Sequence, residues 1–316
     1  MAATERILVT GAGGFIGSRL LRPGDRALVR HAAKTPHAAV GDLLDPRSLM
    51  AACARIETIF HCAGYAHAFR ASDPDAHWRI NYEGTRNLLD AAAACGVRRF
   101  VFLSSVKAMP DPGTACADES FAGEPATPYG KAKRAAEEAV LEAGARTGMH
   151  VVNLRLAMVY GRGGRGNLER MARGIRAGWF PPLPETGNRR SLLHVEDAVA
   201  AMRLVAARPE ANMATYIVAD GAPHSGRQLY DAIRAALQLP PATWSVPASL
   251  LRAAGVAGDR LGGSMQRTLP FNSEVVARLL DSAWYSPARI RGELGWQASI
   301  PLAAGIKEML GVEAGV

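Results

Sequence analysis

A glycine-rich loop directly follows the first apolar segment of this chain. The segment RILVT (6–10) has the composition of a buried strand, and three glycines follow it at the head of a helical pattern. In this spacing the first glycine permits a tight turn, the second lets the backbone approach a pyrophosphate, and the third lets the helix pack closely on the strand. Free N–H groups at the start of the helix favour phosphate. The sequence therefore predicts a dinucleotide site at Gly11, Gly14, Phe15, Ile16 and Gly17.

Short apolar runs alternate with helical patterns through the first half of the chain. The expected strands are continuously apolar, as strands buried on both faces are, and span 6–10, 26–30, 58–62, 99–105 and 150–156. The expected helices between them span 45–54, 75–96 and 126–148. Asp45 and Pro46 indicate a helix start, and Gly96 and Gly148 indicate helix ends. This alternation predicts an α/β fold with a doubly wound parallel sheet of the Rossmann type.

The first crossover in this pattern is unusually short. Only about eight residues (18–25) separate Gly17 from the second strand, whereas a full crossover helix needs about a dozen. We therefore expect the first helix to be clipped.

The composition changes after about residue 160, where loops rich in glycine, proline and arginine appear. We expect residues 1–160 to form the dinucleotide-binding domain, with later segments near 190–220 returning to it. Residues 161–316 are expected to form mainly a smaller, discontinuous C-terminal lobe that binds the substrate.

Composition argues against several other classes of protein. The formal net charge is +8, but the arginines are scattered and no aromatic-rich stacking motif accompanies them, so nucleic-acid binding is not expected. The four cysteines have no metal-ligand spacing, which predicts reduced thiols and no metal site. No signal peptide and no apolar run of transmembrane length is present. We expect a cytoplasmic protein that does not bind membranes.

The end of the second strand bears on the choice between NAD and NADP. An acidic residue there accepts the ribose hydroxyls of NAD, whereas an arginine accommodates a 2′-phosphate. Arg30, with His31 and Lys34 nearby, favours NADP, although a solvated basic turn has the same composition. Asp42 and Leu43 follow the next strand and are expected to meet the adenine edge of the cofactor.

Tyr129 and Lys133 stand four residues apart in PYGKAK (128–133), on one face of an expected helix. Alone, this spacing is a weak signal, because a basic amphipathic helix would produce it by accident. Its surroundings give it weight. In chain order the sequence contains TGAGGFIG (10–17), HCAG (61–64), INYEGTRNLLDAA (80–92), FLSS (102–105), YGKAK (129–133), RRSLLHVEDAV (189–199) and ELGW (293–296).

These motifs resemble those of the extended short-chain dehydrogenase/reductase family, NAD-dependent epimerase/dehydratase type, over nearly the whole length. Within it they are similar to the nucleotide-sugar epimerases, dehydratases and 4-ketoreductases. The resemblance implies that Tyr129 is the general acid/base, that Lys133 lowers its pKa and holds the nicotinamide ribose, and that Ser105 binds the same substrate oxygen, with Ser104 as its rival. It also implies a cofactor path at Ala63 and Gly64, supported by Asn81.

The substrate contacts follow from the same resemblance. Asn167 and Arg190 are similar to residues that hold a UDP-sugar, and Arg267 or Arg278 is a candidate for a second phosphate contact. His67, with Arg70, is a candidate for touching the sugar, whereas His61 ends a buried strand and is interpreted as structural. Lys107 stands where typical epimerases and dehydratases place a threonine. No Asp-Glu pair follows Ser105 at once, which disfavours dehydration.

Two enzymatic hypotheses and one other remain open at this point. The first is an epimerase that interconverts UDP-hexoses at C4 through a 4-keto intermediate, using bound NAD. The second is an NADPH-dependent 4-ketoreductase of a nucleotide-linked keto-deoxysugar in polysaccharide synthesis, which Arg30 favours. A non-catalytic NADP(H) sensor is the remote third, because fold alone does not establish function. The resemblance also implies a homodimer formed through the helices at 75–96 and 126–148.

Overall fold

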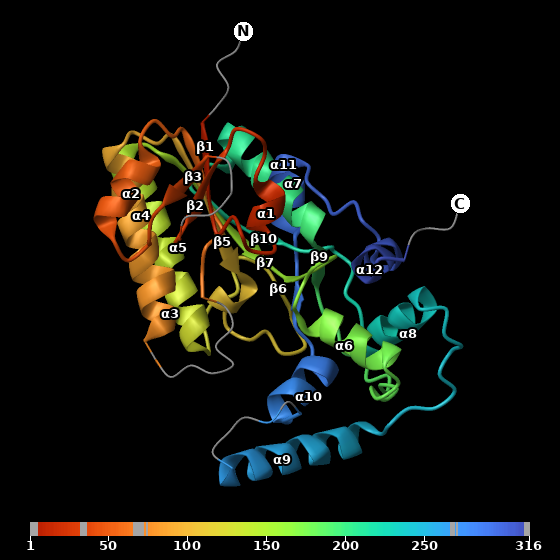
Figure 1. Cartoon of the computed structure of the whole chain (residues 1–316). Coiled ribbons are helices and arrows are strands. Elements are labelled where there is room, and N and C mark those ends of the chain that lie inside the picture. The colour runs from red at the N-terminus through yellow and green to blue at the C-terminus, as the bar shows by residue number, and fades with distance from the viewer. Residues whose placement is uncertain are drawn as a thin grey trace.

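A seven-stranded parallel sheet forms the centre of the protein in a computed structural model (Figure 1). The structure describes residues 6–31, 37–65, 73, 75–265, 269 and 271–312. The strand order is β10-β7-β5-β4-β1-β2-β3, which confirms the predicted doubly wound sheet. Its strands are β1 (Ile7–Thr10), β2 (Arg26–Val29), β3 (Ala38–Val40), β4 (Thr58–His61), β5 (Arg99–Ser105), β7 (His150–Leu156) and β10 (Ala214–Val218).

Alternate residues of these strands enter two hydrophobic layers, because successive side chains point to opposite faces of a sheet. Leu8, Ile59 and Phe100 belong to one layer, whereas Val9 and Phe60 belong to the other. Both layers are closed to solvent, which explains the continuous apolar runs in the sequence. Figure 1 shows the helices that cover the two faces.

The first face is covered by α2 (Pro46–Cys53), α4 (Gly84–Ala94) and α5 (Pro128–Thr147). The predicted helix start is confirmed, since Asp45 Oδ1 accepts a hydrogen bond from Arg47 N at 3.1 Å and Pro46 is the first helical residue. Gly96 and Gly148 have positive φ angles of 70° and 72° at the ends of their helices, as predicted.

The expected helix over 75–96 is present but contains a wider turn. It consists of α3 (Ala76–Trp78), a π-helical turn η1 (Arg79–Glu83) and α4. Such π-turns insert one extra residue per turn and occur often at functional sites. The hydrophobic spacing of the sequence does not reveal the π-helical turn. Asn81 lies within this turn and inside the protein, with 1% of its surface exposed.

The second face is covered by α1 (Gly17–Leu20), α7 (Val195–Ala207) and α11 (Ala288–Leu294). The clipped first helix is confirmed, because α1 has only four residues. Leu20 is fully buried in the layer beneath it. Arg203 of α7 donates a hydrogen bond to the carbonyl oxygen of Leu20, so the neighbouring helix holds the end of this short crossover.

A third hydrophobic cluster lies among helices that follow residue 160. Figure 1 shows helices from this part of the chain beyond one end of the sheet, with α9 (Ala248–Ser264) farthest from it. The cluster involves α6 (Asn167–Arg176), α8 (Gly226–Ala236), α9 (Ala248–Ser264), α10 (Ser273–Leu280) and α12 (Leu302–Leu310). Within the described ranges, no helix is long and apolar enough to cross a membrane. The division into domains near residue 160 stays a prediction.

Two small parallel pairs complete the strands. β8 (Met158–Tyr160) pairs with β9 (Leu192–His194), and β6 (Cys116–Ala117) pairs with β11 (Trp284–Tyr285). Short 3-10 turns, η2 (Val106–Ala108) and η3 (Pro209–Ala211), follow β5 and precede β10. The order of the central strands reverses between β1 and β4, and ligands of such sheets bind outside the carboxyl ends of the strands at that point.

Candidate active site

The glycine loop after β1 lies directly against the end of β4. Gly11 has a φ of 66°, and a Cβ atom there would stand 2.7 Å from Ala63 N. A Cβ on Gly17 would collide with the carbonyl oxygen of Gly11. Gly14 N donates to that same oxygen at 2.8 Å, which closes the turn. Glycine is therefore required at the first and third of these positions for steric reasons.

This loop fits a dinucleotide pyrophosphate. Among the described residues, none accepts a hydrogen bond from the N–H groups of Phe15 and Ile16, which precede α1. Free backbone N–H groups in such a turn are donors suited to phosphate oxygens. The loop and the start of α1 therefore offer the donors that the sequence predicted, although α1 is short.

Arg19 connects the glycine loop to α7 and to the loop before α6, contacts which the sequence did not predict. Its guanidinium lies 4.7 Å from the centre of the Phe15 ring and donates to Phe15 O at 2.8 Å. It also pairs with Glu196 Oε1 of α7 at 2.9 Å and donates to the carbonyl oxygen of Arg162. These contacts join the glycine loop to the loop before α6.

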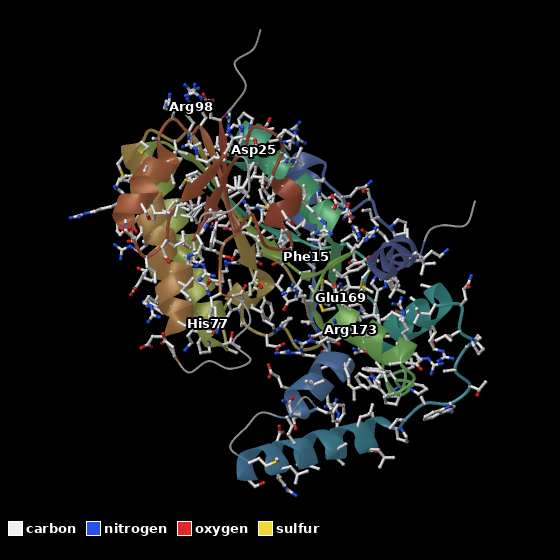
Figure 2. The ribbon with its side chains drawn as sticks, in the orientation of Figure 1. Phe15, Asp25, His77, Arg98, Glu169 and Arg173 are labelled. Atoms are coloured by element: carbon white, nitrogen blue, oxygen red, sulfur yellow. The ribbon has the colours of Figure 1, made fainter. Side chains whose placement is uncertain are left out.

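Glu169, in the first turn of α6, organises that second loop. A Cβ atom on Gly166 would stand 2.9 Å from its Oε2, so the carboxylate occupies the space inside the glycine-rich segment. Burial raises the pKa of Glu169, while backbone N–H groups of Gly161 and Gly166 act in the opposite direction. Figure 2 shows Glu169 and Phe15 near the middle of the molecule, between the sheet and α6.

The start of α5 places Tyr129 beside Ser105. Thr127 Oγ1 accepts from Gly130 N at 3.0 Å and caps the helix, and Pro128 is its first residue. A Cβ on Gly130 would collide with the carbonyl oxygen of Lys107, so glycine lets α5 approach the turn after β5. Tyr129 is half-buried. Burial raises the pKa of Tyr129, and a hydrogen bond with the Ser105 side chain partly offsets this shift.

Lys133 lies one turn further along α5, with 5% of its surface exposed. Its Nζ donates to Leu103 O at 2.8 Å and lies 4.5 Å from the centre of the Phe102 ring. Burial lowers the pKa of Lys133 to about 8, although Glu137 and Cys62 act to raise it. A Cβ on Gly64 would stand 3.5 Å from Nζ, so the ammonium group borders the predicted cofactor path.

A buried carboxylate stands behind this lysine on the same helix face. Glu137 accepts from Arg155 Nε at 3.0 Å and from Arg155 Nη2 at 2.6 Å. Ser104 Oγ also donates to it, at 2.5 Å. The geometry therefore directs Ser104 towards Glu137 and Ser105 towards Tyr129, which supports the choice of Ser105. Sequence reasoning missed Glu137 and Arg155, because a glutamate on a charged helix resembles a solvated residue.

Asn81 holds the loop after β4 from the π-helical turn. Its Oδ1 accepts from Tyr65 N at 2.7 Å, and its Nδ2 donates to Tyr65 O at 3.0 Å. His77 Nδ1 lies 3.0 Å from the same carbonyl oxygen, and the His77 ring meets Tyr129 edge-on at 5.7 Å. Figure 2 shows His77 where α3 lies against α5. Sequence analysis did not single out His77.

The residues predicted to meet the adenosine half lie at the ends of β2 and β3. Arg30 is exposed just after β2. Asp42 Oδ1 accepts from Leu44 N at 2.9 Å, and Leu43 is buried against α4, where a Cβ on Gly84 would stand 2.9 Å from it. The carboxyl ends of these strands lie at the same edge of the sheet as the glycine loop. Lys34 lies outside the described residues.

The candidate substrate residues lie in the later part of the chain. Arg190 Nη1 donates to Asp281 O at 2.8 Å, and burial lowers its pKa, with the nearby Arg278 adding to this effect. Asn167 is the first residue of α6, and Lys107 is exposed in η2. Among the described contacts, none joins these residues to Tyr129. The predictions for His67, Arg70 and Arg267 fall outside the described residues.

Residues 7–219 match the model of the NAD dependent epimerase/dehydratase family, which is more than half of the chain. The chain belongs to this family. Members are NAD(P)-dependent epimerases, dehydratases or reductases, and the resemblance drawn from the sequence motifs is confirmed. Within the described part of the chain, no cluster of three or more His, Cys, Asp or Glu could hold a metal ion.

Individual relatives of this epimerase/dehydratase family member are distant. A UDP-glucose 4-epimerase of Vibrio cholerae is 28% identical over 96% of this chain and 94% of that protein. A 2-alkyl-3-oxoalkanoate reductase of Stenotrophomonas maltophilia (strain K279a) is 26% identical over 96% of this chain and 98% of its own. The solved structure of MoeE5 in complex with UDP-glucuronic acid and NAD has a TM-score of 0.76 at 24% identity, covering 97% of this chain and 98% of that one.

Proposed function

We propose that this protein is a nucleotide-sugar epimerase that interconverts UDP-hexoses at C4 through a transient 4-keto intermediate. The observation that carries the proposal is the constellation of Ser105, Tyr129 and Lys133. The Ser105 side chain lies close enough to Tyr129 to lower its pKa, and Lys133 lies one helical turn away beside Gly64. Oxidising a secondary alcohol requires a base for the hydroxyl proton, and these residues supply one next to the predicted nicotinamide path.

The nicotinamide group supplies a hydride acceptor and donor when it is bound. The glycine loop would hold the pyrophosphate through the N–H groups of Phe15 and Ile16. Tyr129 takes the proton from the C4 hydroxyl and later returns it, while Ser105 donates a hydrogen bond to the same oxygen. Lys133 favours the phenolate of Tyr129, because a nearby positive charge stabilises the anionic form. Asn81 holds the Tyr65 backbone and so keeps the loop beside Gly64 in place.

The nucleotide part of the substrate is assigned to the later lobe. The charge of Arg278, which pairs with Glu274 of α10, also acts on Arg190, and two guanidinium groups directed at one ligand would suit a diphosphate. Asn167 at the start of α6 and Lys107 after β5 are the further proposed contacts. The relative from Vibrio cholerae, a UDP-glucose 4-epimerase, supports a UDP-hexose as the substrate class.

A second candidate is an NADPH-dependent 4-ketoreductase of a nucleotide-linked keto-deoxysugar. Arg30 favours it, because this exposed arginine stands at the end of β2, where a 2′-phosphate is accommodated in such folds. The same Ser105, Tyr129 and Lys133 would serve, since both reactions pass through the same hydride transfer. We also propose that the protein is cytoplasmic and forms a homodimer through α4 and α5.

The nucleotide content of the purified protein distinguishes the two candidates. An epimerase recycles its cofactor in each turnover, so we expect stoichiometric NAD to be released when freshly purified protein is denatured and analysed by chromatography. An empty site that binds added NADPH much better than NADH would instead mean that the cofactor is consumed, which is the behaviour of the ketoreductase.

A further inference from the structure

His61, the last residue of β4, is fully buried and uses both ring nitrogens. Its Nδ1 lies 2.7 Å from Thr10 Oγ1, at the end of β1. Its Nε2 lies 3.0 Å from Thr85 Oγ1, in the first turn of α4. The ring also stacks on Phe102 at 5.5 Å between centroids. His61 therefore connects three elements that meet at the predicted cofactor site.

The direction of each hydrogen bond follows from the groups at the two ends. Thr85 Oγ1 donates its one hydrogen to Asn81 O at 2.7 Å, so it accepts from His61 Nε2–H. His61 Nδ1 then carries no hydrogen and accepts from Thr10 Oγ1, which in turn accepts from Ala63 N at 3.1 Å. The result is one continuous chain of hydrogen bonds from Ala63 N to Asn81 O.

In this arrangement the imidazole is neutral, because a proton on Nδ1 would reverse its hydrogen bond and make the Thr10 hydroxyl accept from both Nδ1–H and Ala63 N–H. Burial lowers the pKa of His61 to about 3, and the positive charge of Lys133 acts in the same direction. Phe102 contacts both groups, since Lys133 Nζ lies 4.5 Å from the centre of its ring. A histidine that stays neutral avoids a second positive charge beside Lys133.

Both ends of the hydrogen-bond chain reach the loop over residues 63–65, which borders Lys133. At one end Ala63 stands against Gly11 of the glycine loop and precedes Gly64. At the other end Asn81 holds the backbone of Tyr65 through two hydrogen bonds. A change at His61 would therefore shift the loop over 63–65 relative to both the glycine loop and the lysine.

We propose that neutral His61 is a positioning residue of the dinucleotide site. It sets the spacing between the Ala63–Gly64 backbone and Asn81, so that the nicotinamide ribose meets a loop already arranged beside Lys133. The inference rests on the proposed function only for the identity of the ligand as a nicotinamide dinucleotide. A merely structural histidine would contribute to folding without affecting dinucleotide affinity.

Three substitutions at His61 distinguish the two halves of the hydrogen-bond chain, the link to Thr10 and the link to Thr85. His61→Phe keeps an aromatic ring against Phe102 but removes both hydrogen bonds, and we expect it to weaken NADPH binding about tenfold or more. His61→Asn retains an acceptor near the Nδ1 position, which keeps the link to Thr10 and Ala63, so part of the affinity should return. His61→Gln retains the donor near the Nε2 position, which keeps the link to Thr85 and Asn81, so it too should recover only part of the affinity.

The measurement is the nucleotide content of each variant as purified, followed by a fluorescence titration with NADPH, repeated with NAD in competition, of protein from which bound nucleotide has been removed, alongside a thermal melt of every variant. Ile59→Ala is the matched control, because Ile59 is fully buried on the same strand and has no part in the chain of hydrogen bonds. We expect it to lower the melting temperature and leave the affinity unchanged. If His61→Phe fails to fold, Thr10→Val tests the same link and should also weaken binding.

The possible failures are distinguishable. Wild-type protein that carries no nicotinamide nucleotide as purified and binds neither added nucleotide would overturn the proposed function, and this inference with it. Wild-type protein that binds normally, together with a His61→Phe variant (or Thr10→Val in its place) within about twofold of its affinity, would overturn the positioning role alone. An asparagine or glutamine variant that binds as tightly as the wild type, or a loss in Ile59→Ala equal to that in His61→Phe, would also overturn it.

Discussion

Replacing Tyr129 with phenylalanine is expected to lower kcat by about 10²–10⁴-fold while KM for the sugar nucleotide changes little. The substitution removes the hydroxyl to which we assign proton exchange with the substrate and leaves the ring in place. Because Tyr129 is half-buried and its ring meets His77 edge-on, the packing at the start of α5 should survive. Steady-state kinetics with UDP-glucose or UDP-N-acetylglucosamine, alongside a thermal melt, measure both effects.

Tyr82→Phe is the matched control for this substitution. Tyr82 lies in η1, its ring is tilted against that of Trp78 with the centroids 4.5 Å apart, and its hydroxyl has no assigned role. We expect its kcat to equal that of the wild type. A Tyr129→Phe enzyme with full turnover would contradict the proposed mechanism.

Replacing Lys133 with methionine is expected to abolish most of the activity without lowering stability. The methionine fills the buried volume next to Phe102 but has no charge to favour the Tyr129 phenolate and no donor for the nicotinamide ribose, so kcat should fall by about 10²-fold or more. Lys131→Met is the matched control, because Lys131 is exposed two residues earlier on the same helix. It should retain normal kinetics.

The stability of the lysine variant follows from the pKa of the buried group. Burial lowers the pKa of Lys133 from 10.5 to about 8, so the charged form is disfavoured in the folded protein by an amount on the order of 3 kcal/mol. Between pH 8 and 10.5 the unfolded chain binds the proton more tightly than the folded one, and the contribution of Lys133 to stability rises with pH. Below pH 8 Lys133 is charged in both the folded and the unfolded protein, so the full free-energy cost of burying the charge remains.

Urea unfolding at several pH values tests whether the contribution of Lys133 to stability rises with pH. Relative to Lys133→Met, the wild-type free energy of unfolding should increase as the pH rises from 8 towards 10. A wild type that instead loses stability relative to the variant over that range would mean that Lys133 is stabilised in its charged form, and the assigned environment would be wrong.

The sequence was sufficient for the parts of the site that depend on local chemistry. The glycine loop could be predicted because Gly11 and Gly17 stand in one short turn where a Cβ atom would collide with the backbone. The start of α5 is readable because Thr127 and Pro128 are a capping residue and a first-turn proline. The clipped α1 could be inferred by counting residues between two strands.

Long-range partners could not be predicted in this way. Glu137 reads as one charge among several on a helix, and only the fold brings Arg155 of β7 to within 2.6 Å of it. The π-turn that buries Asn81 interrupts the helix without interrupting its hydrophobic spacing. His61 was interpreted from the sequence as a structural residue at the end of a buried strand; it is fully buried, but its link to Thr85 depends on the packing of β4 against α4, which the sequence does not show.

Retention of label at C4 during conversion tests the central claim most directly. UDP-glucose carrying deuterium at C4, and UDP-N-acetylglucosamine labelled in the same way, would each be incubated with the enzyme as purified and no added cofactor. The proposed epimerase should yield the C4 epimer of at least one with deuterium still at C4, because the hydride leaves and returns within one turnover. Failure to convert either sugar with NAD bound, or an epimer that has lost its label, would contradict the account.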